Sequence, residues 1–502
     1  MGGTAVIDAP RVDPGAEPFL LGIDLGSSSA RAIVYDGRGA TVAIEFERYS
    51  WTASTDGGLE IEADRLVEIA ASAVDRATLF CRSARIPIAA VGISTFWHGL
   101  VGVDDDGVAT TPVFSWGDTR ASAAAAALRD QADPAAYHQR TGAYFHPGFP
   151  LAKLRWLRER RGEAYRQTRK WISAGDLLTM RLLDARVSSV SMSSASGLFH
   201  QERCDWDEES LALAGIGRGN LYPVAPDEQS WQLTGDWAAR WPELKGVPWT
   251  LAYGDGACAN IGSGCVGVER AALSIGTTAA MRVVVPNRSS KIPIELWSYR
   301  IDRERKVIGG ATSNGGNIYS WCRDTLRLPS NPEEVEAEVG ALEPDSHGLT
   351  FLPFLAGERS PFWPLDASAA ISGITLATTP AAMLRAGLEA VAYRLALLRV
   401  ALRAEIPDAT TIVASGRAIA ESPAFARIIC DVLGEPLHVS SFPESSSRGA
   451  ALLAGEAAAV LRGIDLPAPD WKILEPDLER TRIYAEALAR QRDLERRLGL
   501  AP

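Results

Sequence analysis

Apolar runs and polar turns alternate along the chain, and this alternation predicts strands interleaved with helices. Short apolar runs that end at glycines, acids or hydroxyl residues are typical of buried strands, and they fall at 19–24, 32–36, 87–94, 249–253, 271–275, 280–285 and 411–415. Apolar positions with helical spacing fall at 59–85, 152–160, 171–183, 381–404, 423–433, 447–461 and 477–498. The last of these is charged and amphipathic, so we expect it on the outside. The polar run 188–196 predicts a loop, and the whole pattern indicates an α/β fold.

One pattern occurs twice: a strand, a turn of glycine and hydroxyl residues, and a second strand. The first copy spans 19–36 and the second spans 271–285. Backbone N–H groups and hydroxyls in such turns suit a phosphate group. Two copies about half a chain apart suggest two domains of one ancestral design facing a shared cleft. Each turn would then grip one end of a polyphosphate.

A single acid, Asp255, stands between two glycines at the tip of the strand 249–253. The small residues 257–264 predict a short helix, with Asp255 near its positive end. The second turn follows about twenty residues later. A carboxylate placed before a phosphate-type turn is the layout that phosphoryl transfer needs. A helix N-cap aspartate is the alternative that the flanking glycines also permit.

Composition narrows the class of protein. The 502 residues suffice for two or three domains, and the net charge of −11 argues against broad nucleic-acid binding. Six cysteines without a CxxC spacing favour a reduced, cytoplasmic chain. Six histidines form no metal-binding motif, and no apolar run predicts a membrane span. Residues 1–18 are rich in Gly, Pro and Ala and predict a flexible tail.

Two local matches to other enzyme classes fail on their context. Residues 262–267 read GxGxxG, but they do not open a helix, so a dinucleotide-binding oxidoreductase is excluded. Residues 26–30 mimic a hydrolase nucleophile elbow, but a strand follows where a helix is needed.

The motifs from about residue 19 to 461 resemble those of the FGGY family of carbohydrate kinases. In chain order they read GIDLGSSSAR, FWHGLVGVD, SWGDTR, RTG, KLRWL, YGDGACANIGSG, SIGTTAAMR, FLPFLAGERSPFW and SSSRGAALLA. The closest likeness is to gluconokinases, through FWHGLVGVD and HPGFPLAKLRWL, and xylulokinases come next. The resemblance implies two ribonuclease-H-like domains of the actin/hexokinase type, with an active-site cleft between them. The expected domains are 19–265, which holds the sugar and the catalytic base, and 266–502, which holds the nucleotide.

The resemblance also implies roles for individual residues. Asp255 matches the catalytic base, and a base in hydrogen-bond reach of a hydroxyl typically contributes about 10²–10⁴ in rate. Asp24 matches a residue that holds Mg²⁺ through water; a turn aspartate is the alternative. The residues that match the ATP-binding motifs are Gly26, Ser27, Ser28, Ser29, Arg31, Gly276, Thr277, Gly316, Ser320, Gly416 and Arg417. Arg417 replaces the family's usual glycine and Glu421 a frequent Asn, so nucleotide affinity is in question.

The sugar-site motifs hold Trp97, His98, Trp116 and Asp118, which combine an apolar wall with hydrogen-bonding groups. Asn260 lies one helical turn after Gly256 and is expected to face the same cleft. Gly148 stands where relatives often carry an aromatic residue. Lys153 is expected to be a solvated helix residue, with neutralisation of a carboxylate as the alternative.

The predicted function is ATP-dependent phosphorylation of a terminal hydroxyl, with D-gluconate to 6-phosphogluconate as first choice. A xylulokinase or another ketose or polyol kinase is the alternative within the family. A non-catalytic sensor that binds sugar and nucleotide is the alternative from another class, and Arg417 motivates it. The expected partners are a sugar or sugar acid and ATP/ADP, with no nucleic acid, no membrane and a possible homodimer.

Overall fold

The computed structural model describes residues 17–500 except 227–229, 288–290, 365–366, 441, 443, 465 and 467–470. Most of the tail predicted at 1–18 therefore lies outside the described residues. The chain forms two compact units. The first comprises the described parts of Met1–Gly264, Tyr299–Glu304 and Glu444–Pro467, and the second those of Cys265–Ser298, Arg305–Pro443 and Ala468–Pro502.

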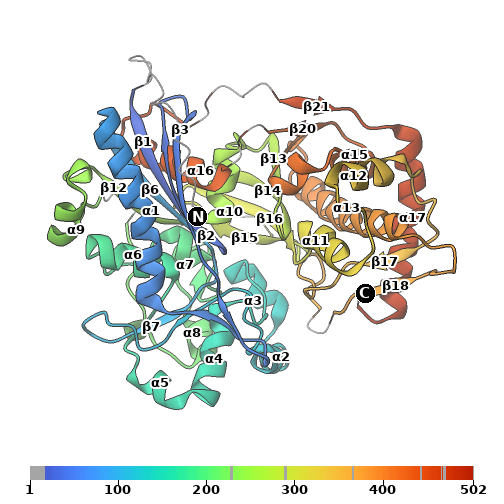
Figure 1. Ribbon diagram of the computed structural model, residues 1–502. Helices are drawn as coiled ribbons and strands as arrows, with labels where there is room; N and C mark the ends of the chain where they lie inside the picture. The colour runs from blue at the N-terminus through green and yellow to red at the C-terminus, as the bar shows by residue number, and fades with distance from the viewer. Residues whose placement is uncertain are drawn as a thin grey trace. The chain divides into compact units, whose positions relative to one another are not determined.

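The first unit is built on a five-stranded sheet (Figure 1). Its strands, in spatial order, are β12 (Trp249–Gly254), β6 (Ile88–Thr95), β1 (Phe19–Leu25), β2 (Ser29–Tyr35) and β3 (Thr41–Arg48). The β1–β2 and β2–β3 pairs are antiparallel, whereas β6 runs parallel to both β1 and β12.

The sheet of the second unit repeats this arrangement. Its corresponding strands are β20 (Leu437–Val439), β19 (Thr411–Ser415), β13 (Arg270–Ile275), β14 (Ala279–Pro286) and β16 (Arg305–Thr312). The β13–β14 and β14–β16 pairs are antiparallel, and β19 runs parallel to β13 and β20. The strands β15 (Trp297–Arg300) and β21 (Lys472–Leu474) extend its two edges. The predicted α/β fold with two similar domains is therefore confirmed.

Two helices of the first unit reach its sheet in different ways. Helix α1 (Ala63–Ala84) buries eleven residues, mostly Ala, Leu, Ile and Val, on its apolar face. Helix α16 (Ser445–Ala457) instead lies with its backbone against the strands. A Cβ built on Gly22 of β1 would lie 2.1 Å from the Ser447 oxygen, and one on Gly92 of β6 would lie 1.9 Å from the Ala450 oxygen. Glycine at both positions lets α16 approach this closely.

Shorter elements complete the first unit. They are β4 (Thr52–Ala53), β5 (Leu59–Ile61), β7 (Val101–Val103), β8 (Val113–Phe114), α2 (Ser122–Gln131), α3 (Pro134–Thr141), α4 (Pro150–Arg160), α5 (Gly162–Gln167), β9 (Lys170–Ile172), α6 (Ala174–Leu183), α7 (Val190–Ser194), β10 (Phe199–His200), β11 (Asp205–Trp206), α8 (Glu208–Ala214), α9 (Gly235–Arg240) and α10 (Asp255–Gly262), with 3₁₀ turns at Arg218–Asn220 and Pro242–Leu244. The predicted loop at 188–196 is wrong, because Ser189 caps the buried helix α7 by accepting from the Met192 N–H. The predicted helix at 171–183 begins as strand β9, and a Ser173–Asp176 capping box starts α6.

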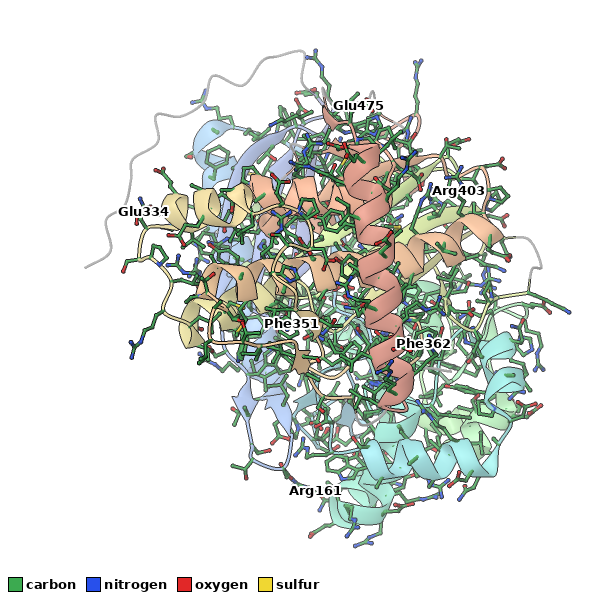
Figure 2. The ribbon with its side chains drawn as sticks, turned by 90° about the vertical axis from the view of Figure 1, so that its right-hand side faces the viewer. Arg161, Glu334, Phe351, Phe362, Arg403 and Glu475 are labelled. Carbon is green, nitrogen blue, oxygen red and sulfur yellow. The ribbon has the colours of Figure 1, made fainter. Side chains whose placement is uncertain are left out.

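The remaining elements of the second unit are α11 (Gly316–Thr325), α12 (Pro332–Ala341), β17 (Thr350–Leu352), β18 (Ala370–Ser372), α13 (Pro380–Glu405), α14 (Arg417–Glu421), α15 (Pro423–Leu433) and α17 (Leu478–Arg497). Figure 2 shows α17 crossing this unit, and its Gln491 donates a 2.8 Å hydrogen bond to the Phe351 oxygen. The helix predicted at 477–498 is confirmed, with Asp477 as its N-cap.

Among the described helices, none combines the length and the apolarity needed to cross a membrane.

Candidate active site

The carboxyl ends of three parallel strands in the first unit bring two carboxylates to one edge of the sheet. Asp24 of β1 pairs in register with Ser94 of β6, and Ser94 pairs with Tyr253 of β12. Asp255 follows Tyr253 by two residues. Neighbouring strands lie about 4.8 Å apart, so the backbones at Asp24 and Tyr253 are about 10 Å apart. Ligands of open α/β sheets bind outside this edge.

Asp255 is the first residue of α10, and Gly254 occupies the N-cap position. The N-cap alternative for Asp255 is therefore wrong. Its Oδ1 accepts a 2.7 Å hydrogen bond from the Gly256 N–H, and its backbone oxygen accepts one of 3.4 Å from Ser446 Oγ. The helix N-terminus favours the ionised carboxylate. The residue is half-buried, and an ionised carboxylate has the chemistry to accept a proton.

Asp24 is almost fully buried and binds a partner with each oxygen. Its Oδ1 accepts a 2.8 Å hydrogen bond from Ser94 Oγ, and its Oδ2 forms a 2.8 Å ion pair with Arg31 Nη1. The Gly26 N–H donates to the Ser29 oxygen at 3.0 Å and closes the turn between them. The turn-aspartate alternative fails, because Asp24 binds a neighbouring strand and an arginine instead of its own loop.

Two aromatic residues that the sequence analysis did not select hold the first turn. Trp51 Nε1 donates to the Ser27 oxygen at 2.7 Å, and the Tyr49 N–H donates to the Ser28 oxygen at 3.1 Å. The Tyr49 hydroxyl donates to the Gly26 oxygen. With these carbonyls fixed, Ser27 and Ser28 remain exposed. The sequence could have indicated these two residues, because Tyr49 and Trp51 are two positions apart directly after a strand-like run, a spacing that places both side chains on one face.

Trp97 lies directly against the residue that precedes Asp255. A Cβ built on Gly254 would lie 1.8 Å from the Trp97 ring, so only glycine admits the indole there. Trp97 Nε1 donates to the Ser191 oxygen at 3.1 Å, and Ser191 Oγ accepts from the Gly254 N–H at 3.1 Å. The strand end, the indole and α7 thus form one fixed wall beside Asp255.

His98 continues this wall. Its Nδ1 lies 2.6 Å from the Ala195 oxygen, which can only accept, so Nδ1 carries the proton and Nε2 is the acceptor of the neutral ring. The Phe149 ring lies 4.5 Å from His98, and the Tyr299 ring lies 5.6 Å from His98 and 5.1 Å from Trp97. Phe149 and Tyr299 were not selected from the sequence. Tyr299 lies in the short segment that returns to the first unit from the second, and no local pattern reports such a return.

Asp118 is buried in an ion pair instead of lying open. Its carboxylate accepts hydrogen bonds of 3.1 Å from Arg120 Nε and from the Leu59 N–H. Arg120 also pairs with Glu60 at 2.7 Å, and its guanidinium lies 4.7 Å from the Trp156 ring. The SWGDTR motif therefore builds a cross-linked loop, in which Asp118 orients its neighbours.

The other predicted sugar-site residues differ in exposure. Trp116 is half-buried, and its backbone oxygen lies 3.0 Å from where a Cβ on Gly148 would stand. A larger residue at Gly148 would therefore have to displace the Trp116 backbone. Asn260 is fully buried within α10. The structure thus brings the Trp97 ring against Gly254, the residue before Asp255, with His98 following Trp97 in the chain, and it places Asn260 in the interior.

The prediction that Lys153 is solvated is wrong. Lys153 is 1% exposed, and its Nζ donates to the backbone oxygens of Pro147 (3.0 Å) and Gly148. Burial lowers the pKa of Lys153 from 10.5 to about 7. The negative charge of Asp118 opposes this lowering, and the positive charge of Arg120 adds to it. Helical spacing alone marked this position as polar, and it did not reveal that the loop 146–149 folds over the ammonium group.

The buried lysine predicts how stability changes with pH. Between pH 7 and 10.5 the unfolded chain keeps the Lys153 proton and the folded chain loses it, so stability should rise with pH in this window. The gain between pH 7 and 9 is on the order of 2 kcal/mol. In Lys153→Met this increment should disappear, and in the exposed control Lys245→Met it should remain. Urea unfolding at several pH values measures it, and parallel profiles for wild type and Lys153→Met would contradict the assignment.

In the second unit, the turn 276–278 meets the start of α11. The Gly316 N–H donates to the Gly276 oxygen at 2.8 Å, and the Asn317 N–H donates to the Thr277 oxygen at 3.2 Å. A Cβ on Gly316 would lie 2.7 Å from the Gly276 oxygen, so glycine is required for this contact. Gly276 and Thr277 themselves are exposed. The two segments predicted to contact phosphate and nucleotide are therefore joined by backbone hydrogen bonds.

Gly416 lies beside the same turn, because β19 runs parallel to β13. It has φ of 103°, and a Cβ there would lie 2.4 Å from the Ile275 oxygen, so no other residue fits without strain. Arg417 starts α14 with an 80% exposed side chain, and its Nε pairs with Glu421 at 2.6 Å. Ser320 is exposed, with its hydroxyl 3.4 Å from the Gly316 oxygen. The two departures from the family pattern, Arg417 and Glu421, thus neutralise each other on one helix face.

A second acidic cluster lies in the second unit. Oxygen and nitrogen atoms of Asp345, His347 and Glu389 lie within 4.8 Å of one another. Glu389 already accepts from Arg385 Nε at 2.6 Å, from the Tyr484 hydroxyl at 3.2 Å and from His347 Nε2 at 3.0 Å. These bonds account for the buried carboxylate as part of a structural network.

Comparison with known proteins matches both halves of the chain. The models of the N-terminal and C-terminal domains of the FGGY family of carbohydrate kinases match residues 19–262 and 271–458. A gluconokinase from Bacillus subtilis is 27% identical over 458 residues, which cover 89% of each chain. A glycerol kinase from Citrifermentans bemidjiense is 29% identical over 483 residues, covering 92% of this chain and 95% of that one. The crystal structure of a xylulose kinase from Lactobacillus acidophilus superposes with a TM-score of 0.88 at 22% identity, over 96% of this chain and 98% of that one.

Proposed function

Because the chain belongs to the FGGY family of carbohydrate kinases, which are phosphotransferases that use ATP, we propose that it phosphorylates a terminal hydroxyl of a sugar acid, with D-gluconate as the first choice. The product would be 6-phosphogluconate. The similarity to a gluconokinase over 89% of the chain supports this substrate. The observation that carries the phosphotransfer itself is the half-buried carboxylate of Asp255 at the start of α10, with Trp97 against the preceding glycine.

We assign a task to Asp255 and to each of the predicted sugar-site residues Trp97, His98, Asp118 and Trp116. Asp255 takes the proton from the acceptor hydroxyl, which is a poor nucleophile while it keeps that proton. Trp97 supplies an apolar wall for the carbon skeleton, and His98 Nε2 accepts a hydrogen bond from a substrate hydroxyl. Asp118 acts indirectly, since Arg120 already binds its carboxylate. Trp116 is half-buried and lies beside the loop that Lys153 holds, where it forms a second wall.

The donor set of the first turn fits a magnesium ion held through water. Asp24 provides a carboxylate, whose oxygens also accept from Ser94 and Arg31, and Ser27 and Ser28 are exposed residues of the following turn. Carboxylate and hydroxyl oxygens are hard ligands of the kind Mg²⁺ prefers. The bound ion would neutralise charge on the phosphates. Within the second unit, we propose that the nucleotide contacts Gly276, Thr277, Gly316, Ser320, Gly416 and Arg417. Within the first unit, we propose that the turn residues Gly26, Ser27, Ser28, Ser29 and Arg31 bind phosphate.

A coupled ADP-release assay across possible acceptors tests the substrate. The panel is D-gluconate, D-xylulose, D- and L-ribulose, L-fuculose, glycerol and erythritol. We expect kcat/KM for D-gluconate to exceed that for every other acceptor by at least about tenfold, a difference of about 1.4 kcal/mol in transition-state binding.

The outcomes of the panel separate the alternatives. A highest kcat/KM for D-xylulose would overturn gluconate in favour of a ketose kinase, which the fold similarity to a xylulose kinase allows. If no acceptor of the panel led to ADP release, while gluconate and ADP still stabilised the protein against heat, the proposed acceptors would be contradicted altogether.

A further inference from the structure

Arg31 of the first turn is held by two carboxylates. Its Nη1 forms a 2.8 Å ion pair with Asp24, and its Nε forms one of 3.2 Å with Glu444 Oε2. Glu444 lies 413 positions later in the chain, immediately before the motif SSSRGAALLA, and it belongs to the same compact unit. The sequence offered no reason to connect it with the phosphate turn.

Glu444 is fixed in place by its own backbone. It is the N-cap residue of α16, and its oxygen accepts hydrogen bonds of 3.2 Å from the Tyr35 hydroxyl and from Ser447 Oγ. The Tyr35 and Ser447 hydroxyls also lie 2.6 Å apart, within hydrogen-bond distance. Tyr35 lies at the end of β2, the strand that contains Arg31. The carboxylate that binds Arg31 therefore comes from a rigid helix start joined to the same strand.

The two ion pairs use two different edges of the guanidinium group. Asp24 binds at Nη1 and Glu444 at Nε, which fixes the plane of the group, because guanidinium is flat. Within the part of the chain that the structure describes, Nη2 makes no hydrogen bond or ion pair, and 27% of the side chain is exposed. A planar group fixed at two edges, whose Nη2 has no acceptor among the described residues, suits an incoming phosphate oxygen.

We propose that Glu444 is a positioning residue of the phosphate-binding turn: it fixes the Arg31 guanidinium so that Nη2 meets a nucleotide phosphate, and it shares Arg31 with Asp24. This inference rests on the proposed phosphotransfer function. Without Glu444 the arginine would pair with Asp24 alone. Asp24 would then be less available to a divalent cation, and Arg31 would be free to rotate away from the phosphate.

A half-exposed ion pair contributes little to stability, so a purely structural role predicts little kinetic change when it is broken. The positioning role predicts a kinetic change that is confined to nucleotide binding. In Glu444→Gln we expect the KM for MgATP and the Kd for MgADP, measured by calorimetry, to rise about five- to tenfold. The KM for the sugar and the melting temperature should change little. Glu444→Asp should recover part of the loss, and Glu456→Gln, a half-buried glutamate on the same helix, serves as the matched control.

A double-mutant cycle identifies the residue through which Glu444 acts. If Glu444 works through Arg31, adding Glu444→Gln to Arg31→Met should weaken MgADP binding no further. Additive losses, or an unchanged Kd in Glu444→Gln, would overturn the proposal. Because calorimetry with MgADP needs no sugar, this arm gives an answer even if the gluconate assignment fails.

Discussion

Replacing Asp255 by Asn is expected to lower kcat by about 10²–10⁴-fold, because asparagine keeps the shape of the carboxylate but cannot take a proton from the acceptor hydroxyl. The Asn Oδ1 can still accept the hydrogen bond that the Gly256 N–H donates to Asp255 Oδ1. The start of α10 should therefore keep its geometry. Sugar binding, measured by calorimetry, should stay within about threefold of wild type, so the loss belongs to the chemical step.

The matched control for this substitution is Asp236→Asn. Asp236 is an exposed acid in the first turn of α9, so its replacement removes the same charge at a helix start outside the candidate site. We expect unchanged turnover in this control. Turnover of Asp255→Asn near that of wild type would refute Asp255 as the base, and loss of both activity and sugar binding would point instead to a disturbed α10.

The parts of the fold and the site that could be predicted depend on local pattern. The hairpin around Gly26 and the one around Gly276 were found because strand, glycine turn and strand are adjacent in the chain. The position of Asp255 followed from a strand that ends between glycines. In parallel strands such ends share one edge, so the placement of Asp24 near Asp255 could also be expected once the strands were recognised.

The remainder depends on contacts that the local periodicity of the sequence does not report. Tyr299 packs on Trp97 because the chain returns briefly to the first unit, which no periodicity records. Lys153 was expected to be solvated because a lysine on a helix is ordinarily so, yet the carbonyls of Pro147 and Gly148, in the loop directly before its helix, bind its ammonium group. Glu444 reaches Arg31 across most of the chain. Tyr299 and Glu444 acquire their roles from partners far away in the chain, and Lys153 acquires its role from the way a neighbouring loop folds.

Replacing Gly449 by Ala should cost about 3 kcal/mol of stability, the scale of overpacking in a close contact. A Cβ on Gly449 of α16 would lie 1.9 Å from the Cys258 oxygen of α10, and one on Gly262 of α10 would lie 1.8 Å from the Ser445 oxygen of α16. The two helices therefore touch backbone to backbone in both directions. Neither contact can relax by a side-chain rotation, so the helices must separate.

Separation of α10 from α16 should also displace Asp255, because α10 begins at this residue and Ser446 of α16 donates a hydrogen bond to its backbone oxygen. We expect kcat to fall together with the urea midpoint in Gly449→Ala. Gly340→Ala is the control: it also lies in a helix, its Cβ would come no nearer than 3.8 Å to any neighbour, and it should gain up to about 1 kcal/mol. Equal urea midpoints of the two variants would show that the backbone contact between α16 and α10 does not determine the position of α10. A lowered midpoint with unchanged kcat would show that the position of Asp255 is set by its own strand, β12, and not by α16.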